Sequence, residues 1–171
     1  MEQKIKIIIA DKNEDIRESL REYLETHGTQ TVYEASTKEE LITGILANET
    51  PEEKQKRLEA DVAKTLHFLG ISANIKGYLY LRTSILLTIE NPNEMSVVTK
   101  ALYPTVAKIY GTTPSCVERA MRHAISTAWE CGDLSALKLY FSNTVKNSRG
   151  KPTNSEFIAM IAEHIKMKFD I

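Results

Sequence analysis

The sequence predicts a mostly α-helical protein in which a helical domain follows a short β-α-β-α segment. Two β-branched runs, each followed by a helical pattern, occupy the first 47 residues. From residue 60 onward, apolar residues recur at helical spacing between glycine and proline breaks. We therefore expect a β-α-β-α segment at 1–47, a linker at 48–59 and a helical domain at 60–171.

The first strand and helix are expected near the N-terminus. Lys4–Ala10 (KIKIIIA) has the β-branched, continuously apolar character of a buried parallel strand. After a short turn, a helix is expected from about Glu14 to His27, with Gly28 as its stop. The apolar positions of this helix share one face: Ile16, Leu20, Tyr23 and Leu24.

A second strand and helix complete this segment. The strand is expected at Thr31–Ala35, and Ser36 or Thr37 caps a helix that runs to about Leu46. The polar stretch at 48–59 then interrupts the pattern, and no third strand follows it. Pro51 within this stretch suits the first turn of a helix.

The rest of the chain is predicted to be helical. The breaks between helices coincide with glycine or proline, as at Gly70, Pro92, Gly111 and Gly132. The expected helices are Ala60–Leu69, Ile75–Glu90, Val97–Leu102, Thr105–Tyr110, Pro114–Glu130, Leu134–Tyr140 and Ser155–Lys168.

Composition limits the class of protein. No apolar run approaches the roughly 20 residues that a membrane-spanning helix needs, and the charged start is unlike a signal peptide, so we expect a cytoplasmic protein. Cys116 and Cys131 are expected to be free thiols. The four histidines are scattered, so we expect no metal site and no cofactor. No phosphate loop, nucleophile elbow or pair of carboxylates at catalytic spacing is present, which argues against an enzyme.

The charge is divided unevenly along the chain. Residues 1–59 contain 9 Lys and Arg against 14 Asp and Glu, a balance of −5, whereas residues 60–171 contain 13 against 9, a balance of +4. A basic half of this kind favours binding to nucleic acid. An ordinary solvated surface explains the same balance equally well.

A helix-turn-helix is predicted at residues 103–122 (YPTVAKIYGTTPSCVERAMR). This motif needs a small residue where its two helices cross, a glycine in the turn and a β-branched residue between the helices, and Ala107, Gly111 and Val117 stand at those positions. Thr113 and Pro114 form a good cap and first residue for the second helix. Val106, Tyr110 and Ala120 are expected to face inward.

The outward face of the second helix supplies groups that read DNA. Arg119, Arg122 and His123 lie at i, i+3 and i+4, so they project from one face. Arginine recognises guanine with a bidentate contact, Glu118 accepts from cytosine, and Ser115 reaches a phosphate. The plain alternative is that Glu118 and Arg122 form only an i,i+4 surface pair.

Three segments carry a resemblance to a known family. They are IKGYLYLR (residues 75–82), LYPTVAKIYGTTPSCVERAMRHAISTAW (102–129) and KPTNSEFIAM (151–160). They closely resemble the effector domain of the stage zero sporulation protein A family, the master response regulators of endospore formation in Firmicutes. The resemblance runs from about Ala60 to the C-terminus.

This resemblance implies a six-helix-type effector domain that binds double-stranded DNA at short boxes with a TGTCGAA-like core, often as a tandem dimer. By position, Glu118, Arg119, Arg122 and His123 match the family's recognition-helix residues. Cys116 stands where the family usually has arginine. The segment Trp129–Val145 resembles the part through which the family touches an RNA polymerase sigma factor, and it is divergent here.

The first 47 residues resemble a truncated receiver domain of the same family. KIKIIIADKNED is similar to the first receiver strand and its acidic turn, but Lys12 follows Asp11 where receivers have a second acidic residue for the metal ion. The linker occupies the place of the phosphoacceptor strand. Asp11 is therefore expected to cap the turn rather than bind metal.

These observations predict a sequence-specific DNA-binding transcription regulator of sporulation-type genes that acts without aspartyl phosphorylation. We expect phosphate contacts from Lys108, Arg149 and Lys151, and a homodimer formed through the receiver remnant. The alternative is an interaction protein that pairs with a full-length sporulation regulator and titrates it.

Overall fold

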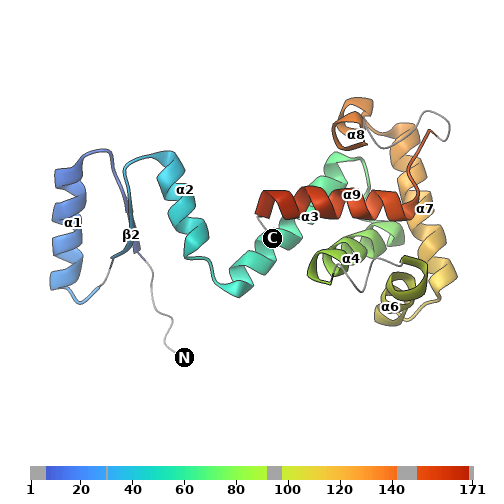
Figure 1. Ribbon diagram of the computed structural model, residues 1–171, viewed down its shortest axis with the longest axis horizontal. Helices are drawn as coiled ribbons and strands as arrows, with labels where there is room; N and C mark the ends of the chain where they lie inside the picture. The colour runs from blue at the N-terminus through green and yellow to red at the C-terminus, as the bar shows by residue number, and fades with distance from the viewer. Residues whose placement is uncertain (1–6, 30, 92–97, 142–149, 170–171) are drawn as a thin grey trace. The chain divides into compact units, whose positions relative to one another are not determined.

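The computed structural model describes residues 7–29, 31–91, 98–141 and 150–169. The chain divides into two compact units, Met1–Lys54 and Gln55–Ile171. Figure 1 shows their helices and strands, most of them labelled. The mostly α-helical class predicted from the sequence is confirmed, with a two-stranded parallel sheet in the first unit.

The N-terminal unit contains a two-stranded parallel sheet between two helices. The strands are β1 (Ile7–Ala10) and β2 (Thr31–Ala35), and α1 (Glu14–Thr26) and α2 (Lys38–Ala47) lie on opposite sides of the sheet (Figure 1). In the register, Ile8 pairs with Tyr33 and Ala10 with Ala35. The β-α-β-α order agrees with the prediction, and the expected start of the first strand lies outside the described residues.

Polar caps set the beginnings of both helices in this unit. Asn13 precedes α1, and its side chain accepts a hydrogen bond from the Asp15 amide. Thr37, rather than Ser36, caps α2 by accepting from the Glu40 amide. Hydrogen bonds from the Ser36 amide and hydroxyl to the Glu40 carboxylate lower the pKa of Glu40. Ser36 and Thr37 thus together form the N-terminal cap of α2.

The core of the N-terminal unit is small. Among its residues whose burial is described, Ile9, Ala35 and Gly44 are the buried ones, and α1 has none. Six large apolar side chains of its two helices are exposed: Ile16, Leu20, Tyr23, Ile42, Ile45 and Leu46. Little apolar surface is therefore removed from water in this unit, and burial contributes little to its stability.

Helix α3 (Pro51–Phe68) begins well before the predicted start at Ala60. Pro51 occupies the first position, where a missing amide costs nothing, and the Thr50 hydroxyl accepts a hydrogen bond from the Glu53 amide. Leu58 lies in the core, and the Arg57 guanidinium stands 4.1 Å from the centre of the Phe169 ring. Residues 55–59 of the stretch expected to be a linker therefore belong to the helical unit.

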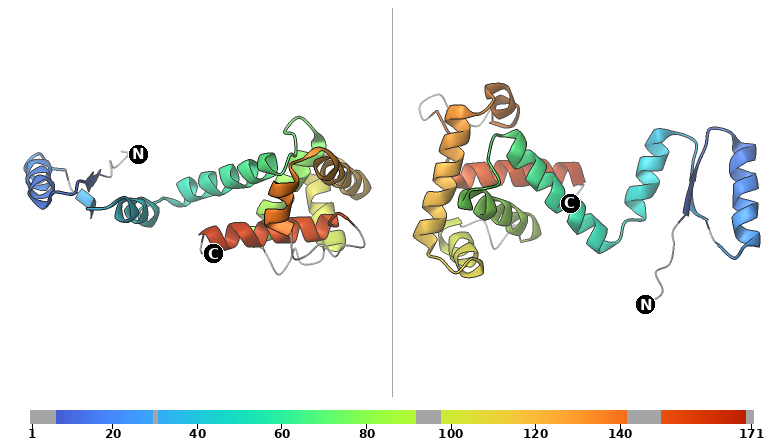
Figure 2. Two further views of the ribbon diagram at one scale, coloured as in Figure 1. Left: turned by 90° about the horizontal axis from the view of Figure 1, so that it is seen from above. Right: turned by 180° about the vertical axis from the view of Figure 1, so that it is seen from behind.

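The helical unit continues after α3 with a series of helices (Figures 1 and 2). A π-helical turn, η1, leads directly into α6, so Tyr103 and Pro104 belong to a helix instead of marking the expected break before Thr105. Pro104 is tolerated because it stands in the first turn of α6. The bounds are α4 Lys76–Glu90, η1 Val98–Leu102, α6 Tyr103–Ile109, α7 Pro114–Cys131, α8 Leu134–Phe141 and α9 Asn154–Phe169.

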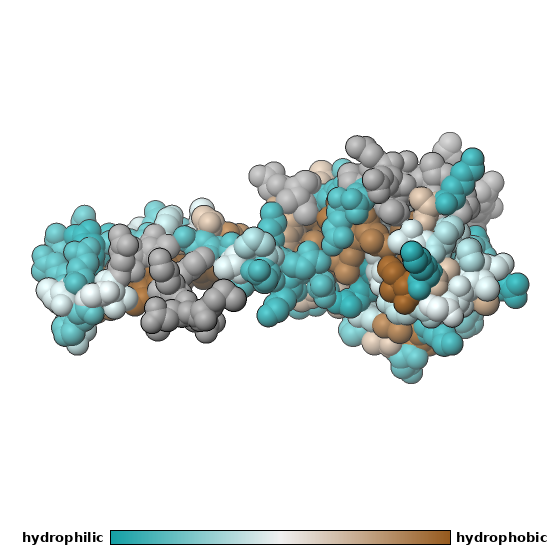
Figure 3. All heavy atoms as spheres, turned by 90° about the horizontal axis from the view of Figure 1, so that it is seen from below, coloured by the Kyte–Doolittle hydropathy of each residue, from teal (hydrophilic) through white to brown (hydrophobic). Residues whose placement is uncertain are grey.

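Helix α4 supplies the centre of this unit, because α6, α7 and α9 all pack against it. Its fully buried Leu81 and Ile85 belong to one continuous hydrophobic core. Other fully buried members of that core include Leu66, Leu102, Met121, Ile125, Phe157, Ile161 and Ile165. Hydrophilic side chains dominate the outer surface that Figure 3 shows. Within the described ranges, no helix combines the length and apolar character needed to cross a membrane.

Gly77 sets how closely α4 and α7 approach. A Cβ atom at this position would lie 2.7 Å from the Ala124 Cβ and closer still to the carbonyl oxygen of Ala120. The carbonyl belongs to the backbone of α7, so it cannot rotate away as a side chain would. Any side chain at residue 77 would therefore push α7 outward.

We predict that Gly77→Ala lowers the free energy of unfolding of the helical unit by about 1–3 kcal/mol, the usual cost of overpacking a core. Urea unfolding followed by far-UV circular dichroism measures this change. Lys76→Ala, an exposed neighbour on the same helix, is the control and should shift the free energy by less than about 0.5 kcal/mol. Equal urea midpoints for the two variants would show that α4 and α7 accommodate the added methyl group without loss of stability.

Candidate nucleic-acid interface

Helices α6 and α7 form a helix-turn-helix at residues 103–131. Gly111 adopts a φ of 61°, in the left-handed region that favours glycine. The Thr112 amide donates to the Ala107 carbonyl, and the Thr113 side chain caps α7 by accepting from the Cys116 amide. Ala107 and Val117 are both buried, as the motif requires.

The three other residues predicted to face inward differ in their burial. Val106 is fully buried, and Ala120 packs against the core while partly exposed. Tyr110 is 37% exposed, so its predicted inward position is wrong. Its ring packs 5.0 Å from that of Tyr80, and its hydroxyl hydrogen-bonds to Thr83. The polar end of tyrosine stays near water while its ring covers α4.

A buried asparagine connects three helices around the motif. The Asn154 side-chain amide, at the start of α9, donates to the Tyr103 hydroxyl on α6 at 3.1 Å and to the Glu118 carbonyl on α7 at 3.0 Å. Burial raises the pKa of Tyr103, which keeps its hydroxyl neutral. Because unpaired buried polar groups are costly, these bonds favour one arrangement of α6 and α7. No local sequence pattern marks Asn154, since its partners are 51 and 36 residues away.

The predicted DNA-reading residues lie together on α7, away from its buried side. Ser115, Arg119, Arg122 and His123 are exposed, and Glu118 is half-buried. The buried residues of α7 occupy the opposite face: Val117, Met121, Ala124, Ile125 and Ala128. The exposed face is therefore open to a partner, with cationic side chains grouped along it.

Glu118 and Arg122 form the i,i+4 ion pair that the sequence suggested as the plain alternative. The Arg122 Nε donates to the Glu118 Oε1 at 2.8 Å, and the two side chains are 52% and 33% exposed. A pair this exposed contributes only about 0–1 kcal/mol, so a stronger partner can replace it. The pair holds both groups extended along the outer face of α7.

Further cations lie near this face. Lys108 is exposed on α6, and the Lys151 Nζ donates to the Ser126 hydroxyl on α7 at 2.9 Å. Lys151 also lies 4.0 Å from the Glu130 carboxylate. Arg149, the third predicted phosphate contact, lies outside the described residues.

A shallow hollow runs along the exposed face of α7, and we call it the α7 hollow. Its lining contains three short side chains, Cys116, Ala120 and Ser126, among longer polar ones. Hydrogen bonds with the Thr113 and Thr112 side chains lower the pKa of the Cys116 thiol. The complete lining is Cys116, Arg119, Ala120, Arg122, His123 and Ser126.

The acidic turn of the N-terminal unit is occupied by backbone hydrogen bonds. The Asp11 carboxylate accepts from the Asn13 amide at 2.8 Å, and the Arg17 guanidinium donates to the Asp11 carbonyl at 2.7 Å. Lys12, the next residue, is exposed. In the parts of the chain that the structure describes, no group of three or more His, Cys, Asp or Glu is placed to hold a metal ion.

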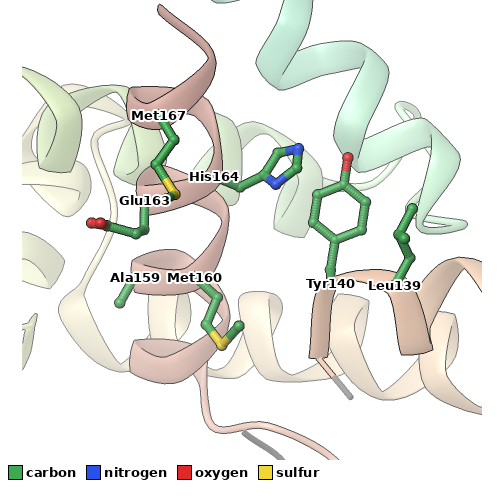
Figure 4. A pocket seen from close by; sticks show the side chains of 7 residues that line it. All are labelled: Leu139, Tyr140, Ala159, Met160, Glu163, His164 and Met167. Atoms are coloured by element: carbon green, nitrogen blue, oxygen red, sulfur yellow. The ribbon is translucent and has the colours of Figure 1, made fainter. Parts of the chain in front are cut away.

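A second hollow lies between α8 and α9 (Figure 4). Tyr140 and His164 face each other across it, with ring centres 4.6 Å apart. Leu139 and Met167 on its rim are 71% and 76% exposed. Such exposed apolar side chains are typical of surfaces that contact another protein.

The chain matches one family model over residues 62–165, more than half of its length. That model is described as the C-terminal domain of the sporulation initiation factor Spo0A. The matched residues include α4, η1, α6, α7 and α8, the last seven residues of α3 and most of α9. This domain is a DNA-binding effector domain, not a catalytic one. The chain therefore belongs to the Spo0A family of sporulation regulators.

Proposed function

We propose that this protein is a sequence-specific DNA-binding transcription regulator of sporulation genes that acts without aspartyl phosphorylation. The main support is α7, which presents Arg119, Arg122 and His123 on one exposed face of a packed helix-turn-helix. The family membership gives the class of ligand, DNA. We expect the protein to act in the cytoplasm, where that DNA is.

In this proposal α7 enters the major groove and its exposed face reads the bases. The Arg119 and Arg122 guanidinium groups match the two acceptors of guanine, O6 and N7. The Glu118 carboxylate accepts from the cytosine amino group, and the weak Glu118–Arg122 pair opens as each group finds its base. Ser115, in the first turn of α7, donates its hydroxyl to a phosphate, which the helix dipole also favours.

Lysines beside the reading face supply contacts that do not depend on sequence. Lys108 extends from α6, and Lys151 is positioned by its hydrogen bond to Ser126 near the C-terminal half of α7. Each phosphate contact releases a counterion, so salt weakens this part of the affinity. These contacts position α7 on the duplex.

Independence from phosphorylation is supported by the acidic turn. The Asp11 carboxylate already accepts a backbone hydrogen bond, and the positive charge of Lys12 beside it opposes a divalent cation. After α2 the chain enters α3 at Pro51, where a receiver would continue into its phosphoacceptor strand. DNA binding would then require no release by a phosphoryl group.

The N-terminal unit suits a role in dimerisation. Within the described residues its sheet has two strands, so β1 and β2 each have one edge without a neighbour. Apolar side chains on α1 and α2 are also exposed, and a second copy would cover them. Two copies would bring two recognition helices to one DNA, as tandem boxes require.

Transcriptional activation would involve the α8–α9 hollow. Its residues Leu139 and Tyr140 belong to the segment that resembles the family's sigma-factor contact, and they are accessible there. If DNA binding failed, the alternative of an interaction protein that titrates a full-length regulator would take its place. The presence of Arg119 and Arg122 on an exposed face favours the DNA-binding role.

We predict that Arg119→Ala and Arg122→Ala each weaken binding to a TGTCGAA box by about 1–3 kcal/mol and reduce the preference over a scrambled duplex. Fluorescence anisotropy measures the affinity for each duplex and hence the ratio of the two affinities. Lys108→Ala is the control, and it should weaken binding to both duplexes equally because phosphates carry no sequence. A wild-type ratio in either arginine variant would contradict the assignment.

We predict that a small phosphodonor with magnesium leaves the protein unmodified and its DNA affinity unchanged, because Lys12 opposes the metal ion that phosphoryl transfer needs. Intact mass spectrometry and the anisotropy assay measure the two outcomes. Asp11→Asn should behave as the wild type in both assays. An added phosphoryl group on an aspartate would refute phosphorylation independence.

We predict that the full chain sediments as a dimer at micromolar concentrations, whereas a shortened chain beginning at Asn48 sediments as a monomer. The shortened chain keeps all of α3, including the buried Leu58. Residues 1–47 are expected not to be stable alone, since their core is so small. Analytical ultracentrifugation compares the two chains, and monomers in both cases would exclude dimerisation through this segment.

A further inference from the structure

The α7 hollow combines cationic walls with an apolar floor. Cys116 and Ala120, at i and i+4, form that floor, and we call them the Cys116–Ala120 floor. Arg119 lies three residues after Cys116, His123 lies three residues after Ala120, and both also line the hollow. Both floor side chains are short, so the hollow remains open between the long side chains around it.

The floor offers no strong hydrogen bond to a base. The alanine methyl has no donor or acceptor, and a cysteine side chain behaves as a small hydrophobic group. The Cys116 thiol is also engaged by the Thr113 and Thr112 side chains at the turn, which lower its pKa. A base edge that carries only polar groups would lose hydrogen bonds to water here and regain none.

Among the four bases, thymine presents an apolar group in the major groove, its C5-methyl. Purines present N7 and O6 or N6, and cytosine presents an amino group. We therefore propose that the Cys116–Ala120 floor receives a thymine methyl group and selects thymine at one position of the DNA site. This inference rests on the proposed binding of α7 in the major groove.

Deoxyuridine provides a direct test, because it lacks only the methyl group of thymine. The full chain is titrated with a TGTCGAA duplex, with every single-base-pair variant of it, and with duplexes in which each thymine is replaced singly by deoxyuridine. The binding measurements are made on the acidic side of neutrality, where the Cys116 thiol is favoured over the thiolate. The expected result is a loss of about fourfold at one thymine, the factor that corresponds to burying one methyl-sized group.

Variants of Cys116 test whether that loss of affinity arises at the Cys116–Ala120 floor. Cys116→Ser, which makes the floor polar, and Cys116→Arg, which fills the hollow, should both abolish the response to deoxyuridine at that thymine. Cys116→Ala should retain it, because the floor stays apolar. Cys131→Ser is the matched control, since Cys131 is also exposed on α7 but lies at its other end. Thermal melting of each variant checks the fold, which an exposed position should leave unchanged.

The outcomes separate this inference from the proposed function. Absence of any preference for the box or its variants over scrambled DNA would overturn the proposed function, and this inference with it. Specific binding in which no deoxyuridine changes the affinity would overturn this inference alone. The same conclusion follows if Cys116→Ser keeps the wild-type response, because a different residue would then read the methyl group.

Discussion

The close approach of α4 to α7 at Gly77 is the constraint on which the proposed DNA-binding face depends. A glycine allows the backbone of α4 to lie directly against the Ala120 carbonyl and the Ala124 side chain. Because α4 also packs against α6 and α9, this contact fixes the position of α7 relative to the rest of the helical unit. The recognition helix is thus presented by a packed core rather than by a loop, which limits how far its side chains can move.

Buried polar bonds add orientation to this packing. Apolar contacts are not directional, whereas the two hydrogen bonds from Asn154 require Tyr103 and Glu118 at defined positions. Glu118 is held at its backbone by Asn154 and extends its carboxylate toward Arg122 on the outer side. One residue of α7 therefore joins the interior of the unit to the face proposed to meet DNA.

The two units have different physical characters, which matches their different proposed roles. The helical unit contains a continuous core and an outer face with grouped cations. The N-terminal unit buries little, and its helices expose apolar side chains. A unit with so little buried surface gains stability when a partner covers it. Mutual support between two copies would link the folding of this unit to the pairing of recognition helices.

The sequence by itself determined the helix-turn-helix, because its requirements are local. Ala107, Gly111 and Val117 stand at fixed spacings, and the cap of α7 involves neighbouring residues. Tertiary structure decided the position of Tyr110 and the role of Asn154. Tyr110 stays partly exposed because its ring packs on Tyr80 of α4 and its hydroxyl bonds to Thr83, and Asn154 bonds to residues far away in the chain. Such contacts depend on how helices pack, which no local pattern encodes.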